Sequence, residues 1–195
     1  GRTDPENGTT AIRLQPDLRE LSQFHFLLPE PFKDLSGAIS GEVGLNINED
    51  LVQADGYLGI QNLALRLMPY GTSFQIPDER IEFSGRSVRF DGFSVLDDEE
   101  NELQINGFFE ADGDNTLVMD LNTKSSRFKW FDAVETKESV IGGKVYAALD
   151  LSLQGTLQKP VINTEIIVQE GTDALYRMPG ETLEISSNEG IVYFA

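Results

Sequence analysis

The fold class is decided by residues 140–179, which read VIGGKVYAALDLSLQGTLQKPVINTEIIVQEGTDALYRMP. Every second residue from Val145 to Leu153 is apolar, and the intervening positions include aspartate and serine. Alternation with a period of two is typical of a β-strand that has one buried face. Turn signals at Gly155 and at residues 169–173 then separate two further apolar runs. The stretch therefore predicts a strand, a short connection, a strand, a turn and a strand, with no catalytic motif among them.

Similar alternating segments recur along most of the chain, with Gly, Pro, Asn and Asp between them. Strands at intervals of about 8–12 residues with such turns are typical of an antiparallel all-β architecture. We therefore predict an all-β protein that is built mainly from an antiparallel sheet.

Two further segments need separate predictions. Residues 127–139 lack Gly and Pro, are rich in aromatic residues and carry apolar residues at spacings of three. This pattern predicts one short helix or crossover near 128–138. Near the N-terminus, Phe24, Phe26 and Leu28 alternate with His25, which predicts a strand that ends at the following proline.

The composition excludes several classes of function. Hydrophobic residues make up 39% of the 195 residues and charged residues 25%, which is typical of a folded domain. The net charge of −18 argues against nucleic-acid binding, because a basic surface is needed to neutralise phosphates. The same charge argues against attachment to an anionic membrane surface. The simplest interpretation of the acidity is solubility.

The chain contains no cysteine, so disulfides, thiolate metal sites and a cysteine nucleophile are excluded. No run of about 18 apolar residues is present that could span a bilayer as a helix. The chain does not begin with Met, and it stops at Ala195 within an expected strand. We interpret it as a fragment of a longer protein.

An internal repeat organises the chain. Residues 41–90 and 143–194 both run through an alternating strand, a turn, a second strand, a Gly-Thr turn and a short strand that ends at proline. Chance similarity between β-rich segments is the alternative to a true repeat. We therefore divide the chain into residues 1–34, a lead-in with the first strands, and residues 35–195, which carry the repeat.

Candidates for chemistry are few. His25 is the only histidine and is expected to face solvent, because a metal or catalytic role needs partners. The acidic segment 97–102 lacks the spaced carboxylates of a calcium loop and is interpreted as a solvated hairpin tip. No phosphate-binding glycine loop and no G-x-S-x-G motif occur, and nothing places a carboxylate pair in a cleft. We predict no enzymatic activity, no cofactor and no metal.

Residues 130–179 resemble one known family. An alternating strand opens at Gly143, the pattern G-x-h-x-x-P-x-h (h, hydrophobic) follows at Gly155, and a second strand ends at an x-G-T turn. These features resemble the C-terminal region of TamB, the translocation and assembly module inner-membrane protein of the AsmA-like superfamily in Gram-negative envelopes. Residues 81–93 are also similar to strand passages of that family, and the resemblance extends over residues 35–194.

The resemblance to TamB implies a fold and a role. It implies an antiparallel sheet that is curled into an open trough (β-taco-like) with an apolar interior. The chain would be a periplasmic segment whose full-length protein is anchored in the inner membrane, through regions absent from this fragment. The implied partners are phospholipid acyl chains, carried between the inner and outer membranes, and an outer-membrane β-barrel assembly protein. Support for outer-membrane biogenesis and protein secretion follows from the same resemblance.

The candidate groove residues are the apolar residues at alternating strand positions. They are Val43, Leu45, Ile47, Leu63, Leu65, Leu67, Val88, Phe90, Leu103, Ile105, Leu117, Met119, Leu121, Val145, Ala147, Leu149, Leu151 and Leu153. Many are aliphatic and similar in size, which suits a surface for acyl chains better than an interdigitated core of varied residues.

Two other functions stay open. In the first, the chain is a chaperone-like module that offers a sheet edge to a partner strand by β-augmentation during outer-membrane protein assembly. In the second, it is a plain β-sandwich binding domain, and the same leucines form a closed core between two sheets.

Overall fold

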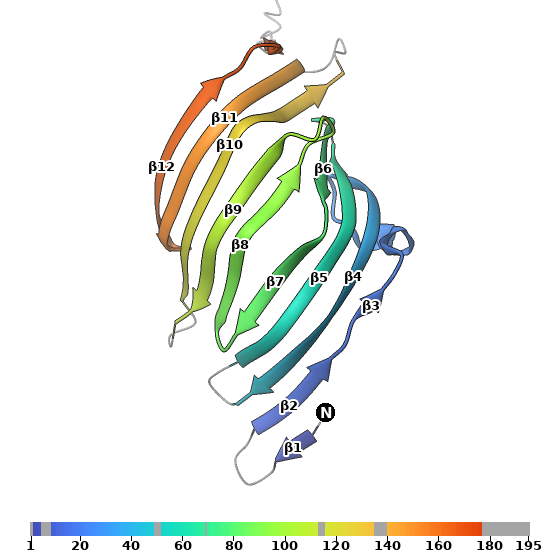
Figure 1. Ribbon diagram of the computed structural model, residues 1–195, viewed down its shortest axis with the longest axis vertical. Coiled ribbons are helices and arrows are strands. Elements are labelled where there is room, and N and C mark those ends of the chain that lie inside the picture. The colour runs from blue at the N-terminus through green and yellow to red at the C-terminus, as the bar shows by residue number, and fades with distance from the viewer. Residues whose placement is uncertain are drawn as a thin grey trace, which may run out of the picture.

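The computed structural model of the protein describes residues 2–4, 9–48, 52–68, 70–112, 116–134 and 140–176. These residues form one sheet of 13 strands in which every pairing is antiparallel. Figure 1 shows the strands side by side from β1 at one edge to β12 at the other, with a visible twist. The prediction of an all-β, antiparallel fold is therefore confirmed.

The strands follow the chain in order, with one short 3-10 helix near the N-terminus. The elements are β1 (Arg2–Asp4), β2 (Thr9–Leu14), β3 (Asp17–Leu18), η1 (Leu21–Leu27), β4 (Phe32–Ile47), β5 (Val52–Leu67), β6 (Thr72–Ile76), β7 (Glu79–Ser84), β8 (Ser87–Leu96), β9 (Glu102–Ala111), β10 (Leu117–Ala133), β11 (Ile141–Thr156), β12 (Lys159–Val168) and β13 (Asp173–Tyr176). Neighbours along the sheet run β1-β2-β4-β5-β6-β8-β9-β10-β11-β12. Three short strands lie off this path: β3 pairs with β4, β7 with β5 and β8, and β13 with β11.

The short helix or crossover predicted near 128–138 is wrong over 128–133, because these residues belong to β10. Residues 135–139 lie outside the described residues. The register of β10 against β11 shifts between Ser125 and Phe128 and again between Lys129 and Phe131. Each shift inserts one extra residue, so side chains three positions apart point to the same side of the sheet. The second bulge accounts for the spacing of three between Phe128 and Phe131.

The strand predicted at Phe24 to Leu28 is also wrong, because Leu21–Leu27 form the 3-10 helix η1. Local hydrogen bonds favour the turn: the backbone N–H of Leu28 donates to the carbonyl of His25, and the His25 ring contacts the carbonyl of Ser22. Leu21 is buried, whereas Phe26 is 71% exposed. His25 is exposed, as expected, but lies on a helical turn.

The β8–β9 hairpin is inserted between β6 and β10 and ends before these two strands do, so we call it the wedge. At its tip, β8 pairs with β6 at a single position, where Leu96 lies opposite Gln75. Beyond the tip, β6 meets β10 directly, since the backbone N–H of Asp132 donates to the carbonyl of Tyr70 at 3.0 Å. The hydroxyl of Thr72 also donates to the backbone carbonyl of Trp130 at 2.9 Å. Between β5 and β10 the sheet therefore contains two strands fewer at this end than at the other, and the strands splay around the hairpin (Figure 1).

Gly71 lies at the junction of β6 and β10. Its φ is +69°, and a Cβ there would collide with the carbonyl oxygen of Asp132. We expect Gly71→Ala to lower the free energy of unfolding by about 2 kcal/mol more than Gly85→Ala does. Gly85 is a matched control, because its φ is +60° but a Cβ there meets no atom within 4 Å. Urea denaturation measures both losses, and equal losses would show that the junction contributes no stability.

The two proposed repeat copies pair differently. The β4–β5 and β11–β12 hairpins agree with the alignment, but β6 pairs with β5 whereas β13 pairs with β11. The pairing of β5 is more similar to that of β11 than to that of β12. β5 pairs with the two successive strands β6 and β7, and β11 pairs with the two successive strands β12 and β13. The end of the second copy lies outside the described residues, so the repeat stays a hypothesis.

Candidate functional site

Cross-strand registers place every candidate groove residue on one face of the sheet. Residues that lie opposite each other on antiparallel neighbours share a face. Leu121 of β10, for example, lies opposite Leu153 of β11 and Gly107 of β9, and Gly107 lies opposite Phe90 of β8. We call this side of the sheet the apolar face. Further side chains that the registers add to it are Ile12, Leu14, Ile39, Leu58, Ile60, Phe74, Phe83, Phe109, Phe128, Ile162 and Ile166.

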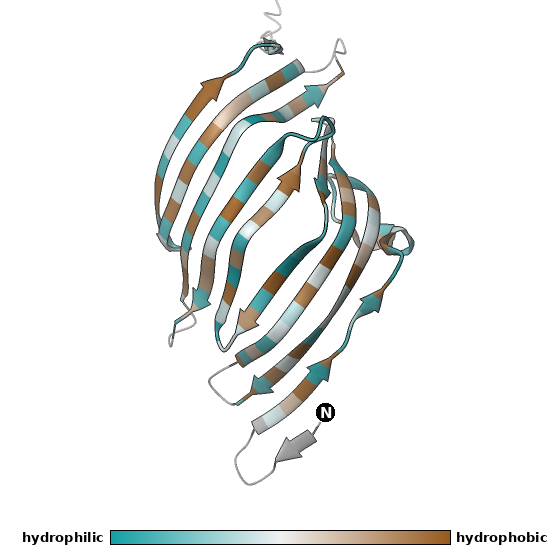
Figure 2. Cartoon of the chain, in the orientation of Figure 1, coloured by the Kyte–Doolittle hydropathy of each residue, from teal (hydrophilic) through white to brown (hydrophobic). Residues whose placement is uncertain are grey.

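The opposite face is mainly polar, although it also carries Phe108, Val161 and Ile167. On β10 and β11 it carries residues such as Asp120, Asn122 and Gln154, and the Lys124 ammonium pairs with the Asp150 carboxylate at 2.9 Å. Figure 2 shows the result as hydrophobic and hydrophilic residues that alternate along the long strands. The sheet thus has one face suited to water and one suited to an apolar neighbour.

The apolar face carries no second layer in the part of the chain that the structure describes. The regular structure of the described residues consists of one sheet and one short helix. These residues therefore do not form the two packed sheets that the sandwich alternative requires. Only Val43, Leu103, Met119 and Ala147 among the candidate groove residues are buried, and the others remain half-buried. On β12 the face becomes open, since Ile162 is 59% and Ile166 62% exposed.

Aromatic side chains fill the apolar face beside the wedge. The Phe128 ring is fully buried and stacks on Phe74, with 6.2 Å between ring centroids. Trp130 packs 4.9 Å from Phe128 and donates its indole N–H to the carbonyl of Ala147 at 3.2 Å. This packing joins β6, β10 and β11 where the hairpin ends.

Asp97 forms the centre of a polar network at the hairpin tip. Its carboxylate accepts hydrogen bonds from the backbone N–H groups of Glu99 and Asn101, both at 2.9 Å, and from the side-chain amide of Asn101 at 2.8 Å. A fourth bond comes from the backbone N–H of Lys129 on β10 at 2.7 Å. Burial opposes ionisation of Asp97, but these hydrogen bonds outweigh it and lower the pKa of its carboxyl group. The expectation of a fully solvated tip is wrong for this residue, which is 0% exposed.

The Lys129 side chain completes the network. It is 5% exposed and forms ion pairs with Asp98, with Glu99 at 3.2 Å and with Asp132 at 3.3 Å. Burial alone would lower its pKa, but the three carboxylates raise it. Tyr146 donates its hydroxyl to Glu99 at 2.6 Å, a bond that lowers the pKa of Glu99 and raises that of Tyr146.

The network is structural in character. It connects the β8–β9 tip to β10 and β11. The carboxylates of Asp97 and Glu99 each accept hydrogen bonds from groups on these strands. Sequence reasoning missed it because its members are about 30 to 50 residues apart in the chain. The density of acidic residues at 97–102 was the only local signal.

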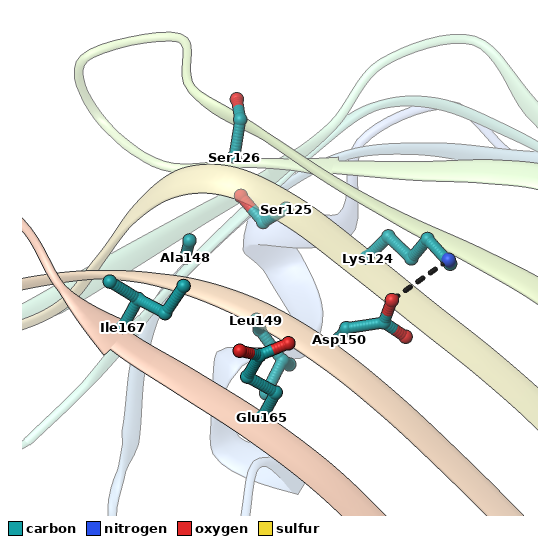
Figure 3. A pocket seen from close by; sticks show the side chains of 8 residues that line it. All are labelled: Lys124, Ser125, Ser126, Ala148, Leu149, Asp150, Glu165 and Ile167. Carbon is teal, nitrogen blue, oxygen red and sulfur yellow. Dashed lines mark hydrogen bonds and ion pairs between the residues drawn. The ribbon is translucent and has the colours of Figure 1, made fainter.

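A cavity of about 290 Å³ opens at the first bulge of β10 (Figure 3). Its lining residues are Lys124, Ser125, Ser126, Ala148, Leu149, Asp150, Glu165 and Ile167. Its charged pair, Lys124 and Asp150, is an ordinary cross-strand ion pair, and Ser125 donates its hydroxyl to the carbonyls of Glu102 and Arg127. We therefore interpret the cavity as a consequence of the bulge.

Among the described residues, no three His, Cys, Asp or Glu side chains are close enough together to hold a metal ion. The described residues also contain no helix with the length and hydrophobicity needed to cross a membrane.

No protein-family model matches the chain, and neither the curated proteins nor the solved structures gave a match. The resemblance to TamB therefore remains an interpretation of the sequence.

Proposed function

We propose that the chain is a periplasmic segment of a TamB-like envelope protein, and that its apolar face lines an open trough for phospholipid acyl chains. In this role it is not an enzyme. It carries lipid between the inner and outer membranes and so supports outer-membrane biogenesis, while other regions of the protein provide the inner-membrane anchor.

One observation carries the proposal: a face that is apolar from β2 to β12 has no second layer on it among the described residues. A contiguous apolar surface of this extent is unfavourable in water and usually marks a binding surface. Each acyl CH₂ group that it removes from water contributes about 0.8 kcal/mol, so a short stretch of chain is enough for firm binding.

Two of the buried polar side chains on the apolar face have internal hydrogen-bond partners. Ser125 donates to the carbonyl of Glu102 at 2.6 Å, and Thr72 donates to the carbonyl of Trp130. Within the described residues, every buried side-chain nitrogen and oxygen atom has a hydrogen-bond partner. An acyl chain can satisfy no hydrogen bond, so a lipid groove requires this internal pairing.

Photo-crosslinking in cells tests the proposal. A photoreactive residue at Leu153 or Ile105, on the apolar face, is expected to give phospholipid adducts in the full-length protein. Matched controls at the adjacent residues Gln154 and Gln104 place the same group on the polar face, where both side chains are exposed. We expect adducts at the apolar positions to exceed the controls by about tenfold, because the probe reacts only with neighbours that it contacts.

Two outcomes would contradict the lipid trough. Equal lipid labelling on the two faces would show that the adducts reflect general membrane proximity. Crosslinks from Leu153 and Ile105 to protein alone would instead favour the chaperone-like function.

A further inference from the structure

β8 is joined to the first half of the sheet by little strand pairing. It pairs with β7 from Ser87 to Arg89 and with β6 at Leu96. In the part of the chain that the structure describes, no pairing joins β8 to β6 or β7 between these two places. By contrast, β8 pairs with β9 along most of its length, and the β4–β5 and β10–β11 ladders also run along most of each strand. We call the line along this weakly paired side of β8 the seam.

A side chain replaces the ladder in the middle of the seam. Pro77 and Asp78 interrupt the chain between β6 and β7, and the backbone N–H of Ser94 on β8 donates to the Glu79 carboxylate at 2.8 Å. Phe93 is 6% exposed, so apolar packing closes the seam in this structure. A carboxylate can rotate with its partner, whereas ladder bonds hold two strands at a fixed spacing. The middle of the seam therefore resists opening less than a fully paired strand does.

Both ends of the seam are held by other contacts. At one end, the backbone N–H of Ala54 on β5 donates to the carbonyl of Gly85, in the turn between β7 and β8, at 2.6 Å. At the other end, β6 meets β10 through two hydrogen bonds and through the stack of Phe74 on Phe128. A sheet that is joined firmly at two points of a line and weakly between them bends most easily about that line.

We propose that the seam is a hinge, about which β1–β7 and β8–β13 move as two rigid halves of the sheet. The angle between neighbouring strands varies widely among sheets, so the short β7–β8 ladder can twist without losing its hydrogen bonds. The apolar face extends over both halves, so the bend widens or narrows it. Where that face holds acyl chains, as proposed above, the bend sets the width available to them, but the hinge itself requires no lipid.

Distances between pairs of spin labels test the hinge. The chain has no cysteine, so two introduced cysteines carry the only labels. Gln61→Cys with Asn163→Cys places the labels in different halves, and the control, Glu110→Cys with Asn163→Cys, places both in the second half, all at exposed positions. In pulsed EPR without lipid, we expect the distribution of distances across the seam to be at least about twofold wider than that of the control. Equal widths would overturn the proposal.

Glu79→Ala tests whether the motion occurs at the seam. It removes the acceptor of the Ser94 N–H, so the distances between labels at 61 and 163 should spread further, while those between 110 and 163 stay unchanged. Glu82→Ala is the matched control, because Glu82 is an exposed glutamate of the same strand whose carboxylate pairs with Arg80. Equal effects of the two substitutions, or no effect of Glu79→Ala, would overturn the proposal.

Amide hydrogen exchange gives an independent measurement. The Ser94 N–H faces the seam, whereas the N–H groups of Phe93 and Val95 face β9, because successive backbone groups of a strand point to opposite sides. After correction for intrinsic rates, Ser94 should exchange at least about tenfold faster than either neighbour. Equal protection of the three amides would contradict the hinge. None of these measurements uses lipid, so a failure of the hinge and a failure of the proposed trough can be told apart.

Discussion

Replacing Phe128 by alanine is expected to lower the free energy of unfolding by about 4 kcal/mol. The Phe128 ring is 0% exposed and packs between Phe74 and Trp130. Its removal loses the transfer free energy of the ring and leaves a cavity where β6 meets β10. Urea denaturation followed by tryptophan fluorescence measures the loss, and Trp130 is the only tryptophan.

Phe26→Ala is the control for this substitution. Phe26 is 71% exposed on η1, so the same truncation should change stability by no more than about 0.5 kcal/mol. A Phe128→Ala loss as small as that of the control would mean that the aromatic packing at the end of the wedge contributes little to the fold.

The second large effect is expected for Asp97→Ala, which should destabilise the protein by about 3 kcal/mol at pH 7. The substitution removes a buried acceptor and leaves the backbone N–H groups of Glu99, Asn101 and Lys129 without their partner. It also frees the hairpin tip from β10, because the bond to the Lys129 N–H joins the two. Asp91→Ala, at an exposed position on β8, should have little effect.

The cost of Asp97→Ala should depend on pH in a defined direction. The folded protein lowers the pKa of Asp97 below its ordinary value of 3.8, so the ionised carboxylate stabilises the fold above that value. This contribution is lost as the pH falls from about 4 towards the lowered pKa of the folded state. Urea denaturation of both proteins from pH 7 to pH 3 should therefore show the difference in stability shrink below pH 4. A difference that stays constant, or grows on acidification, would contradict the role given to the carboxylate.

Much of the candidate site follows from alternation. The apolar positions of β11, from Val145 to Leu153, share a face because successive side chains of any strand point to opposite sides. The same reasoning puts the candidate groove residues of each strand on one side of that strand, and the cross-strand registers show that these sides form one face. Whether that face holds lipid is a matter for the crosslinking experiment.

Other features could not be predicted because they depend on which strands are neighbours. The bulges of β10 are defined by its register with β11. Because a bulge adds a residue, apolar side chains of this strand are three positions apart in the sequence, a spacing that favours a helix. The Asp97–Lys129 hydrogen bond joins residues that only the wedge brings together. At η1, local hydrogen bonds outweighed a short alternating pattern.

By itself, the sequence determined the all-β class and the division of each long strand into an apolar and a polar side. Both are local consequences of the period of two in an extended chain, so they need no knowledge of the neighbouring strand. Only the tertiary structure decided that β6 meets β10 beyond the β8–β9 hairpin and that Asp97 and Lys129 are buried together. Strand pairing is made by backbone hydrogen bonds that nearly all residues can form, so the identity of the side chains leaves the order of strands open.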